Sequence, residues 1–151
     1  MAVLPIVEVP DARLRLVSTP IESVDDSVRQ LVSDMIETMY AAHGIGLAAI
    51  QVGVDKRVLV IDLQEQEDEE GKPVRNPRAF INPEVLEVSE ELSVYNEGCL
   101  SIPEQYAEVA RPARCRLRWL DEQGREDLRR RRKNYVMGQR LSSLKVGAKR
   151  G

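Results

Sequence analysis

Two short segments of the chain contain the residues best suited to chemistry. The first is Asn96–Tyr106, NEGCLSIPEQY, in which Cys99 lies between a glycine and a leucine. Gly98 permits close approach of backbone and Pro103 ends the segment, so Cys99 is expected on a short, shaped strand or loop. A thiol held in this way could bind a metal or act as a nucleophile. The alternative is a small buried hydrophobic residue, the commoner role of a lone cysteine.

The second segment is Gly44–Gly53, GIGLAAIQVG. Gly44 and Gly46 permit a backbone that lies against an extended peptide, while the apolar residues after them pack beneath it. Gln51 follows this run, and its side-chain amide could donate a hydrogen bond to a developing oxyanion. The alternative is a glycine-capped turn with Gln51 simply exposed. A phosphate site is disfavoured because neither a P-loop lysine nor a G-x-G-x-x-G pattern is present.

The chain offers few chemical partners for Cys99. A nucleophilic cysteine needs a histidine base, and His43 is the only histidine. A Cys/His zinc site needs three or four ligands, which Cys99, Cys115 and His43 cannot supply unless distant residues converge. His43 lies at the end of a predicted helix and is expected to be exposed there. Cys115 lies on the inward face of a predicted strand and is expected in the core.

Hydrophobic periodicity predicts the elements that position these segments. A helix is expected from about Asp25 to Ala42, with Ser23 or Asp25 as its N-cap and Gly44 at its carboxy-terminal cap. Its apolar stripe consists of Val28, Leu31, Val32, Met35, Ile36, Met39 and Tyr40. Strands are expected at Arg57–Leu63, Ala79–Ile81, Val85–Val88, Tyr106–Ala110 and Cys115–Leu120, with a loop at Gln64–Pro77 and a turn at Asp121–Gly124. One long core helix among short, mainly antiparallel strands predicts an α+β domain.

Charge divides the 151-residue chain near Gly124. Residues 125–151 contain ten Lys or Arg against two acidic residues, a net charge of +8, so a total of −3 leaves −11 for residues 1–124. We therefore expect one folded domain over residues 1–124 and a basic, disordered tail over 125–151. The sequence lacks a membrane span and a leader pattern, which favours a cytoplasmic protein with reduced cysteines and no membrane partner.

Together, GIGLAAIQVG and EGCLSIPEQ resemble the first and second signature motifs of the peptide deformylases, and the resemblance runs from about Val3 to Gly124. That family removes the formyl group from the amino-terminal methionine of nascent polypeptides in bacterial-type protein synthesis. The resemblance implies that Cys99 is a ligand of a catalytic Fe²⁺ or Zn²⁺ ion. It also implies that Gln51 and the backbone N–H of Leu100 stabilise the oxyanion. The residues implied to line the peptide channel are Ile45, Gly46 and Gly98.

The third signature of the family, an H-E-x-x-H helix, is absent from this chain. In the family it supplies two histidine ligands and the catalytic glutamate. We therefore expect that metal is not stably bound and that the carboxy-terminal helix is missing or replaced. Loss of the general acid–base alone would cost roughly 10²–10⁴-fold in rate. The leading hypothesis is a deformylase-like protein that is inactive as given, through truncation or a frameshift.

Two further hypotheses remain. In one, the chain is a binding module for formyl-methionyl nascent peptide that also contacts ribosomal RNA weakly through the basic tail. In the other, it is an active enzyme whose metal site is completed by carboxylates or by a second subunit. The sequence carries no signal for oligomeric state.

The change of composition near Gly124 leads to a prediction that needs only the coding DNA. An alternative reading frame, entered between roughly codons 120 and 135, should encode H-E-x-x-H followed by an amphipathic helix, because a shifted frame has no reason to keep hydrophobic patterning. Fusing that frame to residues 1–124 should restore metal binding and deformylase activity. The frameshift hypothesis is wrong if neither alternative frame encodes two histidines at that spacing.

Overall fold

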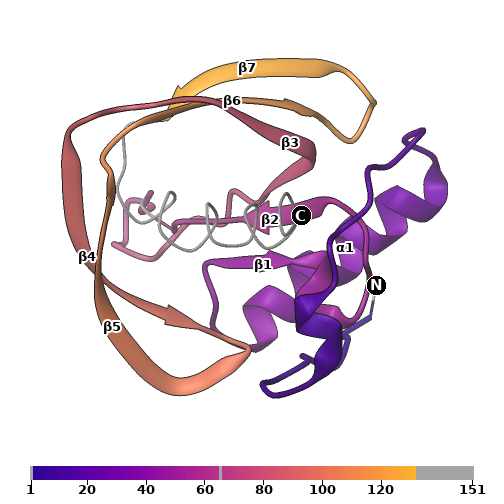
Figure 1. The fold of residues 1–151 in the computed structure, drawn as a ribbon, viewed down its shortest axis with the longest axis horizontal. Helices are drawn as coiled ribbons and strands as arrows, with labels where there is room; N and C mark the ends of the chain where they lie inside the picture. Colours follow the sequence, from indigo (N-terminus) through magenta and orange to yellow (C-terminus); the bar gives the residue numbers. More distant parts are fainter. Residues whose placement is uncertain (1, 65, 132–151) are drawn as a thin grey trace.

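The computed structural model describes residues 2–64 and 66–131. They form an α+β fold, as the sequence predicts, in which helix α1 (Asp26–Ala41) packs against a five-stranded antiparallel sheet and a two-stranded ribbon extends to one side (Figure 1). The sheet has the order β1-β2-β3-β6-β7, and the ribbon is β4-β5. The strands are β1 (Gly46–Ala48), β2 (Val58–Ile61), β3 (Arg78–Val88), β4 (Leu92–Cys99), β5 (Ile102–Pro112), β6 (Cys115–Leu120) and β7 (Glu126–Arg131), with short 3₁₀ helices η1 (Ala12–Arg15) and η2 (Ala49–Val52).

Helix α1 confirms the predicted helix, and its two caps explain where it begins and ends. Asp25 is the N-cap, and its Oδ1 accepts a hydrogen bond from the Val28 N–H at 3.1 Å. At the other end the N–H of His43 donates to the carbonyl of Tyr40, and the N–H of Gly44 donates to the carbonyl of Met39. This is a Schellman motif, in which His43 takes the left-handed conformation (φ 56°) that glycine more often occupies. The residue at the left-handed cap is therefore His43, not Gly44.

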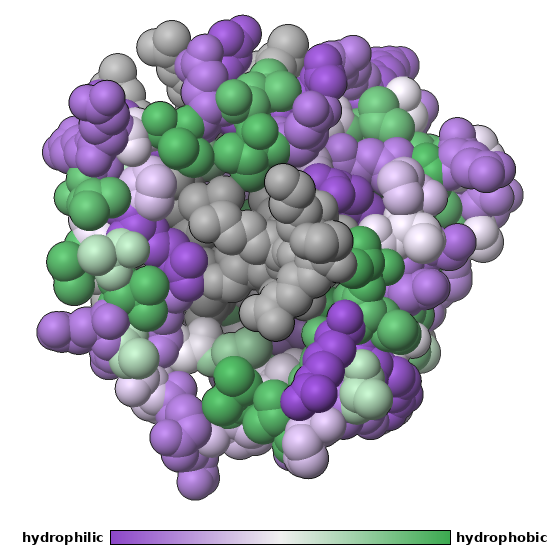
Figure 2. Space-filling view, in the orientation of Figure 1, coloured by the Kyte–Doolittle hydropathy of each residue, from purple (hydrophilic) through white to green (hydrophobic). Residues whose placement is uncertain are grey.

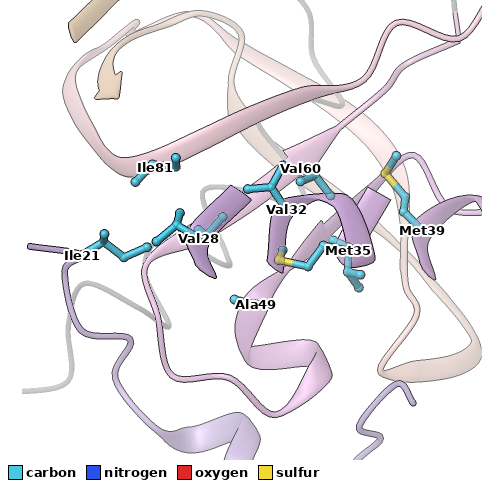
Figure 3. Packing of buried hydrophobic residues seen from close by; sticks show 10 residues of the cluster. Ile21, Val28, Val32, Met35, Met39, Ala49, Val60 and Ile81 are labelled. Carbon is cyan, nitrogen blue, oxygen red and sulfur yellow. The ribbon is translucent and has the colours of Figure 1, made fainter. Parts of the chain in front are cut away.

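The sheet carries a hydrophobic cluster on each face. Side chains of α1, including Val28, Val32 and Met35, pack with Val60 and Ile81 on one face (Figure 3). On the other face the rings of Phe80 and Trp119 meet with centroids 4.6 Å apart, in the same cluster as Cys115 and Leu117. Strand β2 contributes to both clusters, which explains why its sequence is continuously apolar.

Strand β3 differs from the two short strands expected on either side of Asn82-Pro83. The chain passes through this dipeptide as one strand, with irregular register against β6 between Ile81 and Glu84. Asn82 has φ 50°, and its side chain exchanges two hydrogen bonds of 2.7 Å with the backbone of Ile21. The proline therefore interrupts the ladder locally without ending the strand, because a contact distant in sequence fixes the backbone there.

Strand β7 corrects the predicted boundary at Gly124. Its backbone pairs with all six residues of β6, from Leu120↔Glu126 to Cys115↔Arg131. The expectation of a disordered tail is therefore wrong for Glu126–Arg131, because strand β6 offers a ladder of backbone groups whatever the side-chain pattern of its partner. The rest of the tail, residues 132–151, and the predicted replacement of a carboxy-terminal helix lie outside the described residues.

The surface is mixed in character. Hydrophilic side chains cover much of the periphery in the view of Figure 2, with smaller hydrophobic patches between them. On the ribbon, Leu92, Val94 and Tyr106 are exposed by 62, 61 and 72 %. No helix of the described residues is long and apolar enough to cross a membrane.

The packing of α1 on the sheet predicts the effect of a core truncation. Val32→Ala removes two methyl groups from a side chain with 0 % exposure, so it should lower the free energy of unfolding by about 2 kcal/mol. Val17→Ala removes the same groups at a site that is 45 % exposed, and should change it by less than about 0.5 kcal/mol. Urea denaturation followed by Trp119 fluorescence measures both. Equal losses in the two variants would contradict the buried position of Val32.

Candidate functional site

The amino-terminal arm, residues 2–10, is hydrogen-bonded to both motifs. The N–H of Val7 donates to the carbonyl of Gln51 at 2.7 Å, and the N–H of Val9 donates to the carbonyl of Ser101 at 2.9 Å. Gln51 lies in η2 after β1, whereas Ser101 lies in the turn between β4 and β5. The arm thus bridges two segments that are 50 residues apart in the sequence.

The side chain of Gln51 is buried, so the alternative of an exposed glutamine is wrong. Its Oε1 accepts a hydrogen bond from the Ala48 N–H at 3.0 Å. Because the amide group is planar, this bond turns Nε2 toward the second motif. Nε2 lies 3.3 Å from the Ser101 Oγ and 3.6 Å from the Cys99 Sγ. A hydrogen-bond donor from the first motif is therefore aimed at the cysteine of the second.

Cys99 is the last residue of β4, and its side chain is exposed. Leu100 follows in the turn, and its side chain packs against Gly44: a Cβ on that glycine would lie 2.7 Å from the Leu100 Cδ1. Gly98 faces Tyr106 across the ribbon, and a Cβ there would lie 2.7 Å from the Tyr106 Cε1. The two glycines therefore make room for side chains of the opposite segment, which is the close approach expected of Gly98.

Ile45 and Gly46 lie beside this contact, at the start of β1. Gly46 pairs with Ile61 of β2, and the carbonyl of Ile45 accepts a hydrogen bond of 3.0 Å from the N–H of Asp62. Both residues are half-buried, while Leu47 beneath them is buried. Their expected role in lining a peptide channel stays a prediction.

Sequence reasoning missed two polar features of the site. Ser101 is 3 % exposed and accepts the hydrogen bond from the Gln51 amide. The side chains of Glu97 and Arg111 form a bidentate ion pair across the ribbon. The Arg111 Nε lies 2.9 Å from the Glu97 Oε1, and the Arg111 Nη2 lies 3.1 Å from the Glu97 Oε2. This pair fixes the ribbon immediately before Gly98. For Ser101, its position inside the second motif is the signal in the sequence that indicates a role in the site. The sequence carries no such signal for the ion pair.

The donor set around Cys99 can be tested against the metal that the family resemblance implies. No group of three or more His, Cys, Asp or Glu side chains among residues 2–64 and 66–131 could hold a metal ion. The thiol contacts the amide of Gln51, which also donates to the hydroxyl of Ser101. Residues 132–151 contain no His, Cys, Asp or Glu. A catalytic site normally uses three protein ligands, and no such set is found among the residues that the structure describes.

A family model described as polypeptide deformylase matches residues 3–133. The chain belongs to the peptide deformylase family. The match confirms the resemblance of the two motifs and extends beyond Gly124. Members of the family are metal-dependent hydrolases that act on formyl-methionyl nascent peptides.

Individual deformylases agree with this membership. The chain is 72 % identical over 124 residues to the peptide deformylase of Rhizorhabdus wittichii, covering 82 % of this chain and 70 % of the relative. The crystal structure of the deformylase from Ehrlichia chaffeensis has a TM-score of 0.83 and 39 % identity, covering 97 % of this chain and 83 % of that one. The deformylase from Acinetobacter baumannii with Met-Ala-Ser bound has a TM-score of 0.84 and 27 % identity, with coverages of 96 and 94 %.

The different positions of the two cysteines predict their reactivity. Iodoacetamide at pH 8 should alkylate Cys99, which is exposed, and leave Cys115 unmodified in the folded protein. Burial makes Cys115 inaccessible and raises the pKa of its thiol to about 11, so it stays protonated at that pH. Mass spectrometry of tryptic peptides measures both sites, with a urea-unfolded sample in which both should react as the control. Equal labelling of the two cysteines in the folded protein would contradict this placement.

Proposed function

We propose that this chain binds the formyl-methionyl end of a nascent peptide at the two deformylase motifs but does not hydrolyse it in this form. The observation that carries the proposal is the Gln51 amide held 3.6 Å from the Cys99 thiol in a chain with one histidine. The position of the amide supports binding of the formyl group, and the single histidine supports the absence of turnover.

Each part of the binding site has a stated role in this proposal. Gln51 Nε2 donates a hydrogen bond to the formyl oxygen, and the backbone N–H of Leu100 donates a second. Ile45, Gly46 and Gly98 present backbone to the extended peptide. The bound Met-Ala-Ser in the related Acinetobacter structure supports a peptide with an amino-terminal methionine as the ligand class.

The absence of turnover follows from the donor set. Cys99 alone does not hold Fe²⁺ or Zn²⁺ in an open catalytic site, which normally uses three protein ligands. His43 is exposed in the cap that follows α1, and it is not grouped with two further ligand side chains in the part of the chain that the structure describes. Cytoplasmic formylated chains would then be bound and released unchanged.

A second component of the proposal is weak contact with ribosomal RNA. It rests on the net charge of +8 over residues 125–151, which would attract phosphates without regard to base sequence. Such binding would fall steeply with salt concentration.

Isothermal titration with formyl-Met-Ala-Ser tests the binding site. Gln51→Glu keeps an oxygen for the Ala48 N–H but replaces the Nε2 donor with a carboxylate oxygen, so the affinity should fall roughly tenfold or more. Gln123→Glu makes the same change of charge in an exposed turn, and should leave the affinity unchanged. Equal affinity of the two variants would contradict the assigned role of Gln51.

Turnover and metal are measured on the same preparations. Release of formate should match the uncatalysed background, and elemental analysis after growth in iron- or zinc-supplemented medium should find well below one metal per chain. About one metal per chain, together with hydrolysis that Cys99→Ala abolishes, would instead show an active enzyme. Hydrolysis that survives Cys99→Ala would point to a contaminating deformylase.

A further inference from the structure

Asp62 has a buried carboxylate that belongs to neither motif. Asp62 directly follows β2 and is 3 % exposed. Its carboxylate accepts three hydrogen bonds. Oδ2 accepts from the Tyr40 hydroxyl at 2.5 Å and from the Asn76 N–H at 2.9 Å, and Oδ1 accepts from the Gln64 N–H at 2.9 Å. A buried carboxylate with three donors is well satisfied, and its removal would leave each donor without that acceptor.

Two of these bonds join Asp62 to residues distant in the sequence, Tyr40 and Asn76. Tyr40 belongs to the last turn of α1, while Gln64 and Asn76 are the two ends of the acidic loop 64–76. The guanidinium of Arg75, in the same loop, lies 4.2 Å from the centre of the Tyr40 ring. Burial and the bond to Asp62 raise the pKa of the Tyr40 hydroxyl, so it remains a donor at physiological pH. The carboxylate therefore anchors the loop to the helix.

The backbone of Asp62 extends the same connection to the peptide-binding segment. Its N–H donates to the carbonyl of Ile45 at 3.0 Å. Ile45 lies between Gly44, which packs against Leu100, and Gly46, which begins β1. A change in the position of Asp62 would therefore shift the backbone proposed to lie against the peptide.

We infer that Asp62 is a positioning residue, which fixes the backbone of Ile45 and Gly46 for peptide binding and holds the loop 64–76 beside it. The inference rests on the proposed function, since it concerns the same peptide site. Asp62 does not itself touch the peptide. It acts through the carbonyl of Ile45 and through the hydroxyl of Tyr40.

Three variants of the full chain test this role by titration with formyl-Met-Ala-Ser. Asp62→Ala should weaken binding at least tenfold. Asp62→Asn keeps one acceptor oxygen and the shape of the side chain, so it should restore part of the affinity. Tyr40→Phe removes one donor and should weaken binding roughly two- to tenfold. Asp121→Ala is the matched control, because Asp121 also accepts from two backbone amides, those of Gln123 and Arg125, but in the turn between β6 and β7.

Amide hydrogen exchange provides a readout that does not need the peptide. The N–H of residue 62 should exchange faster in Asp62→Asn and in Tyr40→Phe, because its bond to Ile45 loosens. The N–H of Ala48, bonded to Gln51, should stay protected. A general loss of stability would accelerate both amides alike, as would be seen if Asp62 only stabilised the fold.

The outcomes separate this inference from the proposed function. If the wild-type chain does not bind the peptide, the proposed function fails, and exchange at residue 62 still tests the positioning role. If Asp62→Ala does not fold, Asp62→Asn and Tyr40→Phe decide. The inference is overturned if those variants bind as tightly as Asp121→Ala, or if exchange at residue 62 is unchanged.

Discussion

The hydrogen bond from the Ala48 N–H to the Gln51 Oε1 determines the direction of the Gln51 amide. It joins two residues of the same motif, so the local fold of η2 decides which way the amide points. With one end of the planar group fixed, the other must face Ser101 and Cys99. The side chain is buried, and an amide turned the other way would place its NH₂ group against the Ala48 N–H, so that two donors would face each other. A single local bond thereby gives the site a donor of fixed direction.

The residues proposed to bind the peptide are positioned by packing and by hydrogen bonds. The residues proposed to hold the peptide lie at the start of β1, in η2, and at the end of β4 with the turn that follows it. They are positioned by α1, by the arm and by the ribbon. None of these supports requires a histidine ligand. Under the proposed function, the chain keeps the donors for the peptide and lacks the metal ligands and the general base. Similarity of fold and possession of the catalytic groups are therefore distinct properties here.

Local patterns in the sequence predict part of this structure, and distant contacts decide the rest. The helix at Asp26–Ala41 and the strand at Cys115–Leu120 follow from regular apolar spacing, which burial of one face imposes. The passage of β3 through Asn82 depends on Ile21, 61 residues away, and no local pattern carries that contact. The motifs identified Gln51 and Cys99, but the direction of the amide had to come from the fold. Asp62 follows an apolar run as a single polar residue, and its donors on Tyr40 and Asn76 are apparent only from the fold.

The bridging arm has a consequence for how the site is assembled. The bond from Val9 to Ser101 closes a loop of more than ninety residues, whereas the bond from Ala48 to Gln51 closes one of three. Contacts of such different sequence separation form at different stages, because the entropic cost of closing a long loop must be met by structure already present. The donor can thus take its direction early, while the two motifs come together late. During synthesis on a ribosome, Val9 is made more than ninety residues before Ser101, so the bond between them cannot form until the second motif has been made.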